Sequence, residues 1–157
     1  MPCGARGRDL YHIAFSLKTY RVCKTNISLL PIGKNIAKRG TLSDKTIKEL
    51  AVELTVETVK ICDGIHGRSV FINQLLRSCS SIGANSFEAK YAQSDADFIH
   101  KYEIALKESY ETDYWYEVLN KTGDIADDTY KELTAKCGTI RRKIIASIAT
   151  VKKRMAK

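Results

Sequence analysis

The sequence predicts an all-α protein: an antiparallel up-down-up-down four-helix bundle that follows a poorly ordered N-terminal extension. Apolar residues recur every three or four positions in four separate segments, which is the spacing of one face of an α-helix. The chain has only two prolines and nine glycines in 157 residues, so long helices can run uninterrupted. The segments are joined by connections of only a few residues, which favours antiparallel neighbours.

Residues 1–42 differ from the rest of the chain, and we expect a basic, flexible extension there. They lack a sustained helical stripe and contain Gly4, Gly7, Pro31, Gly33 and Gly40. A short strand or helix at 10–17 or 27–32 is an alternative, and so is a start codon placed too far upstream. The acid-poor composition also loosely matches a transit peptide. Residues 43–157 then form the bundle domain.

The first helix is predicted from about Asp44 to Cys62, with Ser43 as its N-cap. It should end at Asp63-Gly64, and Gly67 belongs to the same turn. Two apolar stripes run along it: Ile47, Leu50, Ala51, Leu54, Ile61 and Cys62, and then Val52, Val56 and Val59. This apolar arc is wider than one neighbouring helix requires. Together with Trp115 and several tyrosines it leads us to expect self-association.

The second helix is predicted from about Ser69 to Tyr91 and has small and polar residues in the middle of its inner face. These residues are Ser78, Ser81, Gly83, Ala84 and Asn85. Small side chains allow helices to approach closely, whereas buried Ser and Asn need hydrogen-bond partners. Gly83 costs about 1 kcal/mol relative to alanine in a helix, so we expect it to serve packing.

The third helix is predicted from about Asp95 to Lys121, with Ser94 as N-cap, Asp97 at the third helical position and Gly123 as its stop. Arg77 on the second helix should form a buried or interfacial ion pair with Glu108 or Glu111 on the third. The alternative is that Arg77 contacts a phosphate. The candidate structural or interface residues are thus Arg77, Ser78, Ser81, Asn85, Glu108, Glu111 and Trp115.

The fourth helix is predicted from about Ile125 to Met155, with an apolar repeat over its whole length. At a rise of 1.5 Å per residue it would span about 45 Å, more than its neighbours. We therefore expect its basic end to project beyond the bundle.

The formal net charge of +8 is unevenly distributed. Residues 1–40 carry eight basic residues and one acid, and residues 136–157 carry eight basic residues and no acid, so the middle of the chain is acidic. Basic runs attract polyanions. The candidate nucleic-acid contacts are Arg141, Arg142, Lys143, Lys152, Lys153, Arg154 and Lys157. No aromatic residue interleaves with them in sequence, so we expect backbone-directed, non-specific and salt-sensitive binding, without base stacking.

The five cysteines form no C-x-x-C pair, and no secretory signal is visible, which fits reduced thiols in a cytoplasm. Cys62, Cys79 and Cys137 fall at apolar helix positions, where a cysteine is usually a small core residue. Two D-x-x-H patterns, Asp63/His66 and Asp97/His100, lie at helix ends, so capping and surface roles are favoured over metal binding. We expect no cofactor and no membrane span.

The run from Gln74 to Trp115 resembles a bacterial family. The matching residues are Gln74-Leu75-Leu76-Arg77-Ser78, Ser81-Ile82-Gly83-Ala84-Asn85, Glu88-Ala89, Ser94, Ala96-Asp97-Phe98-Ile99-His100-Lys101, Ile104-Ala105-Leu106-Lys107-Glu108, Glu111-Thr112 and Tyr114-Trp115. They resemble the four-helix bundle proteins first noticed in intervening sequences of large-subunit ribosomal RNA genes. The resemblance implies a bundle that assembles into a ring, a homopentamer.

A related branch is the accessory proteins of diversity-generating retroelements, which are basic, form rings and bind nucleic acid and a reverse transcriptase. The acidic middle of this chain argues against a simple transfer of that role.

Two functions of different classes follow from the sequence. We favour a non-enzymatic homo-oligomeric bundle that acts as an assembly or adaptor module and recruits a protein partner. The alternative is non-specific RNA or DNA binding through the fourth helix and the N-terminal extension, as an accessory to a reverse transcriptase. An enzyme is a distant third, because no base, nucleophile or metal set converges in the sequence.

Overall fold

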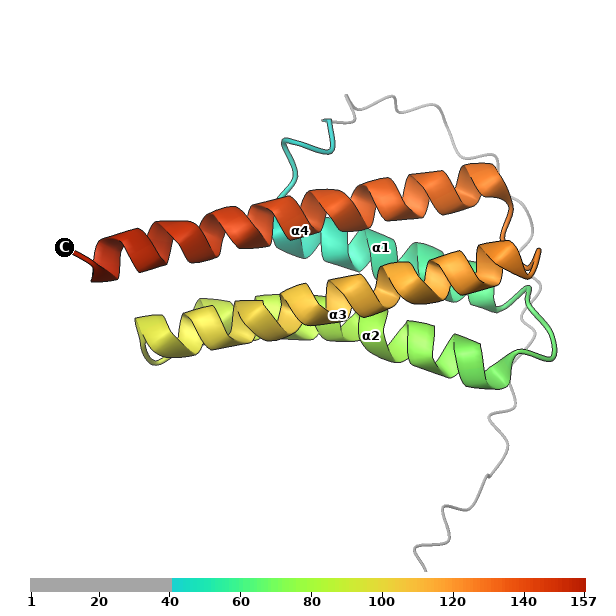
Figure 1. The fold of residues 1–157 in the computed structure, drawn as a ribbon, viewed down its shortest axis with the longest axis horizontal. Helices are drawn as coiled ribbons and strands as arrows, with labels where there is room; N and C mark the ends of the chain where they lie inside the picture. The colour runs from blue at the N-terminus through green and yellow to red at the C-terminus, as the bar shows by residue number, and fades with distance from the viewer. Residues whose placement is uncertain (1–40) are drawn as a thin grey trace, which may run out of the picture. The chain divides into compact units, whose positions relative to one another are not determined.

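The computed structural model describes residues 41–157, which form four α-helices and a short 3-10 helix (Figure 1). In chain order the elements are α1 (Ile47–Cys62), α2 (Ser69–Glu88), η1 (Ala89–Tyr91), α3 (Asp95–Lys121) and α4 (Asp127–Met155). Each helix packs on the one before it, and α4 also packs on α1. The predicted all-α four-helix architecture is confirmed, whereas residues 1–40 of the predicted extension lie outside the described residues.

The start of α1 differs from the prediction. Its N-cap is Thr46, whose hydroxyl accepts a hydrogen bond from the Glu49 amide (3.2 Å) while the Glu49 carboxylate accepts one from the Thr46 amide (2.8 Å). This reciprocal capping box satisfies two backbone donors at once. The predicted cap Ser43 was wrong, because Asp44 instead closes a turn with the Thr41 amide (3.0 Å).

Most of the other helix ends are set by capping residues and glycines close to them in sequence. Ser94 caps α3 as predicted, and its hydroxyl accepts a hydrogen bond from the Asp97 amide (3.1 Å). Gly67 and Gly123 have φ of 78° and 79°, a left-handed conformation that favours glycine over other residues. Two predicted ends were displaced: α2 tightens into η1 after Glu88, and α4 begins at Asp127 rather than Ile125.

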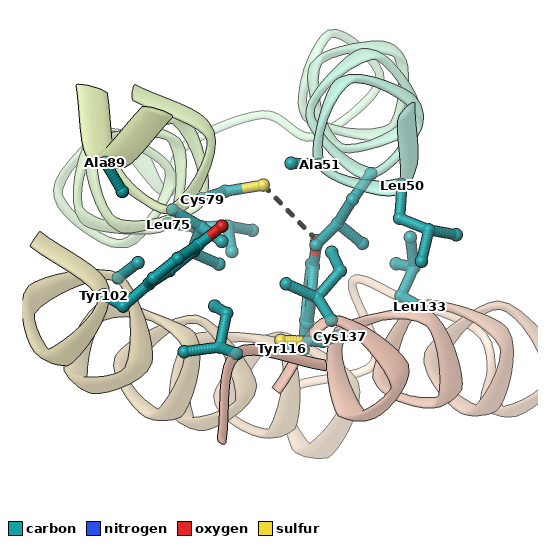
Figure 2. Packing of buried hydrophobic residues seen from close by; sticks show 14 of the residues in the cluster. Leu50, Ala51, Leu75, Cys79, Ala89, Tyr102, Tyr116, Leu133 and Cys137 are labelled. Atoms are coloured by element: carbon teal, nitrogen blue, oxygen red, sulfur yellow. Dashed lines mark hydrogen bonds between the residues drawn. The ribbon is translucent and has the colours of Figure 1, made fainter. Parts of the chain in front are cut away.

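All four helices contribute buried side chains to one core, and Figure 2 shows the labelled ones pointing into the space between the helices. A polar layer crosses this core. The Thr58 and Tyr116 hydroxyls lie 2.5 Å apart, and the Thr112 hydroxyl donates to Ser78 Oγ at 3.1 Å. Because buried polar atoms are costly unless paired, this layer favours one register of the helices over others.

The three cysteines of the bundle are part of its core. Cys62, Cys79 and Cys137 are buried free thiols, which confirms the prediction that they are small core residues. Burial raises the pKa of each thiol, that of Cys62 to about 11. Since the thiolate is the reactive form, these three cysteines should be chemically inert at neutral pH.

The basic end of α4 is exposed beyond Val151, as expected, but it stays tied to α3. Arg154 in its last turn forms an ion pair with Asp95, the first residue of α3, and Val151 is buried. The shortest of the four α-helices is α1. It spans about 24 Å at 1.5 Å per residue and lies beside only part of α4 (Figure 1). None of the helices that the structure describes is long and apolar enough to cross a membrane.

Candidate functional site

An exposed apolar groove runs between α1 and α2. It is lined by Lys48, Ala51, Val52, Thr55 and Val56 of α1 and by Ser80, Gly83, Ala84 and Phe87 of α2, and it encloses about 360 Å³. We call it the α1–α2 groove. Val52 and Val56, 54% and 46% exposed, belong to the second apolar stripe of α1 that the sequence indicated. The stripe therefore has no covering element among residues 41–157.

Gly83 forms part of the floor of this groove. A Cβ at this position would lie 3.6 Å from the Ala51 Cβ, an ordinary van der Waals contact. The expectation that Gly83 serves helix packing within the chain is thus not supported, because alanine would fit against α1. The absence of a side chain deepens the groove instead.

The rim of the groove carries one unneutralised charge. The Lys48 ammonium lies 5.2 Å from the centre of the Phe87 ring, a cation–π distance. Lys48 has no ion-pair partner within the part of the chain that the structure describes. Its neighbour Lys45, by contrast, is paired with Glu53 at 2.7 Å. The groove thus combines an apolar floor with a positive end.

Of the polar residues predicted on the inner face of α2, Ser78 is buried in the bundle, whereas Ser81 and Asn85 are only partly buried. Ser78 is fully buried, and its hydroxyl donates to the Leu75 carbonyl (3.2 Å) while accepting from Thr112. The Asn85 amide donates to the carbonyl and the hydroxyl of Ser81, at 2.9 and 3.1 Å. Ser78 thus links α2 to α3, whereas Ser81 and Asn85 bond to each other and to their own helix.

The predicted ion pair between α2 and α3 is present and joins the two helices, with Glu108 and Glu111 14% and 28% exposed. Arg77 pairs with Glu111 and approaches Glu108 at 3.7 Å, and the Arg77 side chain is 54% exposed. Trp115 donates from Nε1 to Glu111 at 3.3 Å and stacks on Phe71 with ring centres 5.7 Å apart. Because the Arg77 side chain is half exposed to solvent, the ion pair should contribute about 1 kcal/mol.

Several of the candidate nucleic-acid contacts on α4 are neutralised by α3. Arg141 pairs with Asp113, Lys152 with Glu103 at 3.1 Å, and Arg154 with Asp95. Arg142 donates to the Thr139 hydroxyl (2.9 Å) and Lys143 to the Ser43 carbonyl (2.8 Å). Lys153 and Lys157 are exposed and have no ion-pair partner among residues 41–157.

One aromatic residue lies beside these basic side chains in space, although none interleaves with them in sequence. The Arg141 guanidinium lies 4.3 Å from the centre of the Tyr110 ring. The two residues are 31 positions apart, so only the packing of α3 on α4 brings them together. Because the same guanidinium is bound to Asp113, it belongs to the fold more than to a free basic patch.

Sequence reasoning missed the role of Lys136, which it counted only as part of the basic end. This side chain is 10% exposed, and its ammonium donates to both Glu57 oxygens at 2.6 Å and to Glu132 at 3.0 Å. Burial alone would lower the pKa of Lys136, but these hydrogen bonds to carboxylates raise it above its ordinary value. Lys136 thus acts as a charged clamp between α1 and α4.

The histidines of the two D-x-x-H patterns do not come together into a catalytic or metal site. His66 lies exposed in the α1–α2 connection and His100 lies exposed on α3. The described residues contain no group of three or more His, Cys, Asp and Glu side chains placed to hold a metal ion.

Comparison with known proteins gives a match to a family model and matches to solved structures. The family model for the 23S rRNA-intervening sequence protein matches residues 43–146. A solved protein of unknown function from the S23 ribosomal protein family of Bacteroides thetaiotaomicron is 39% identical, with a TM-score of 0.62. The match covers 66% of this chain and 98% of that one. No curated protein matches the chain.

Proposed function

Because the chain belongs to the 23S rRNA-intervening sequence protein family, with its four-helix bundle, we propose that it is a homo-oligomeric assembly or adaptor module that self-associates through the α1–α2 groove. The observation that carries this proposal is the groove itself. It places three large apolar side chains, Val52, Val56 and Phe87, side by side in solvent. Contiguous exposed apolar surface with a polar rim is typical of a protein–protein interface.

A second copy of the chain is the partner that this groove suits best. Each copy that associates removes its own exposed valines from water, at a gain of about 25 cal/mol per Å² of apolar area. Every copy carries the same groove, so one apolar surface repeated around a ring would multiply the interface. A ring of five, as the family resemblance implies, would then display the helix ends of several copies to a protein partner.

Nucleic-acid binding is the weaker candidate. Three of the seven basic side chains considered for it form ion pairs with α3. A polyanion would have to compete with carboxylates that are already in place, so the charge available to it is smaller than the sequence suggests. Arg142, Lys153 and Lys157 are the positions at which such binding would be tested.

The proposed interface is tested by placing a charge in the groove. Val56→Glu should convert the oligomer into a monomer at micromolar concentration, because the carboxylate would be buried without a partner. The control is Val70→Glu, which alters an even more exposed valine, 68% exposed, outside the groove. Sedimentation velocity should show monomers for the first variant and unchanged oligomers for the second. Oligomers that survive Val56→Glu would exclude the groove as the interface.

A further inference from the structure

We infer that the α1–α2 groove of one copy receives the outer surface of α3 from another copy, with Tyr110, Tyr114 and Glu117 entering it antiparallel to α1. This inference rests on the proposed self-association. It adds which helix of the second copy enters the groove, and in which direction that helix runs. It follows from a surface that the fold leaves uncovered, from the spacing of its residues, and from two unneutralised charges.

The outer surface of α3 has tyrosines where a solvated helix usually carries charged residues. Its exposed stripe is Glu103, Lys107, Tyr110, Tyr114, Glu117 and Lys121, opposite the buried stripe of the same helix. Tyr110 and Tyr114 are 54% and 56% exposed. We call Tyr110, Tyr114 and Glu117 the α3 ridge. Large aromatic side chains in such a position are enriched at protein interfaces.

Both tyrosines are held by neighbours within their own chain. The Tyr110 ring lies under the Arg141 guanidinium at 4.3 Å, and the Tyr114 ring packs edge-on against Trp115 with centres 4.9 Å apart. Because these contacts restrict the rings before any partner arrives, binding through them loses little side-chain entropy. The α3 ridge is therefore a pre-organised surface rather than a set of mobile side chains.

The spacing of the ridge matches that of the groove. Lys48, Val52 and Val56 follow one another at four-residue intervals along α1, a rise of about 6 Å per step. Tyr110, Tyr114 and Glu117 follow at intervals of four and three along α3. A helix lying in a groove presents its side chains at this spacing. The small residues Gly83 and Ala84 leave room for a ring between α1 and α2.

Charge selects the direction of the contact. Neither Lys48 nor Glu117 has an ion-pair partner within residues 41–157. In the antiparallel arrangement Tyr110 meets Val56, Tyr114 meets Val52, and the Glu117 carboxylate meets the Lys48 ammonium. The parallel arrangement would instead place Glu117 against Val56 and bury its charge without a partner, which is unfavourable.

The contact joins two different surfaces of the same chain. A copy whose α3 ridge fills a neighbour's groove still offers its own groove to a third copy. Such a heterologous contact repeats until it closes a ring, or it extends as a filament. The structure thus favours cyclic assembly over an isologous dimer in which one groove meets another.

A charge exchange tests the arrangement. Lys48→Glu and Glu117→Lys should each weaken association at least about tenfold through like-charge repulsion, and the double variant should restore it to within about threefold. Sedimentation at 50 mM salt measures this, and melting temperatures of the exposed-site variants confirm folding. Lys153→Glu is the control, since this exposed lysine of α4 lies outside both the groove and the α3 ridge. It should leave association unchanged.

The outcomes separate this inference from the proposed function. If Val56→Glu disrupts the oligomer but the charge exchange does not restore it, the α3 ridge is not the partner and the groove remains the interface. A photoreactive phenylalanine analogue in place of Tyr114 gives a second measurement. It should cross-link to peptides of α1 or α2 from another copy. Cross-links only to other helices would overturn the inference.

Discussion

Replacement of Ile140 by alanine is expected to lower the free energy of unfolding by about 3 kcal/mol, the largest loss that we predict for a single side chain. Ile140 is completely buried in the core, to which all four helices contribute side chains. The truncation removes apolar contacts and leaves a cavity that the surrounding helices fill only in part. Denaturant unfolding at a fixed protein concentration measures the loss, because association also stabilises the folded state.

The matched control is Ile145→Ala, five residues further along α4. Ile145 is 46% exposed, so the same truncation there should cost less than about 1 kcal/mol. Equal losses at the two positions would contradict the packing of α4 described above, because they would mean that both faces of the helix are similarly buried.

Removal of one carboxylate from the clamp at Lys136 is expected to have the second largest effect. Glu57→Met should destabilise the protein by about 2 kcal/mol, because it leaves a largely buried ammonium with Glu132 as its remaining partner. Lys136→Met combined with Glu57→Met should restore part of that loss, because an apolar pair of similar size needs no charge partner. A double-mutant cycle from the unfolding free energies measures the coupling.

An exposed ion pair provides the comparison for the clamp. Glu103→Met removes the partner of Lys152, and both of those side chains are at least half exposed. The expected change is below about 1 kcal/mol, since solvent screens such pairs. Additive effects of Glu57→Met and Lys136→Met would show that the two side chains do not stabilise each other.

The sequence predicts the architecture because its signals are local. The bounds of α3 are correct to the residue, since Ser94 and Asp97 form its cap and Gly123 adopts the positive φ that ends it. The start of α1 was misjudged because two capping patterns overlap there. Ser43 precedes an acid, but only Thr46 has the glutamate three residues later that completes a capping box.

The sequence predicts the α1 side of the groove but not its α2 side. The second apolar stripe of α1 indicated an uncovered surface, and Val52 and Val56 are indeed exposed. Phe87 completes the groove from α2, and nothing in the sequence pairs it with a residue 31 to 35 positions earlier. Likewise, the ion pairs that neutralise Arg141, Lys152 and Arg154 join residues 28 to 59 positions apart. These contacts depend on how α3 and α4 pack, which composition and periodicity do not specify.

The mass of the unmodified chain in solution tests the central claim most directly. One copy has a mass of 17.6 kDa. Multi-angle light scattering on a micromolar solution should give a mass of several chains, five for the ring that the family resemblance implies. A mass of one chain under these conditions would contradict self-association, and with it both the role proposed for the α1–α2 groove and the docking of the α3 ridge.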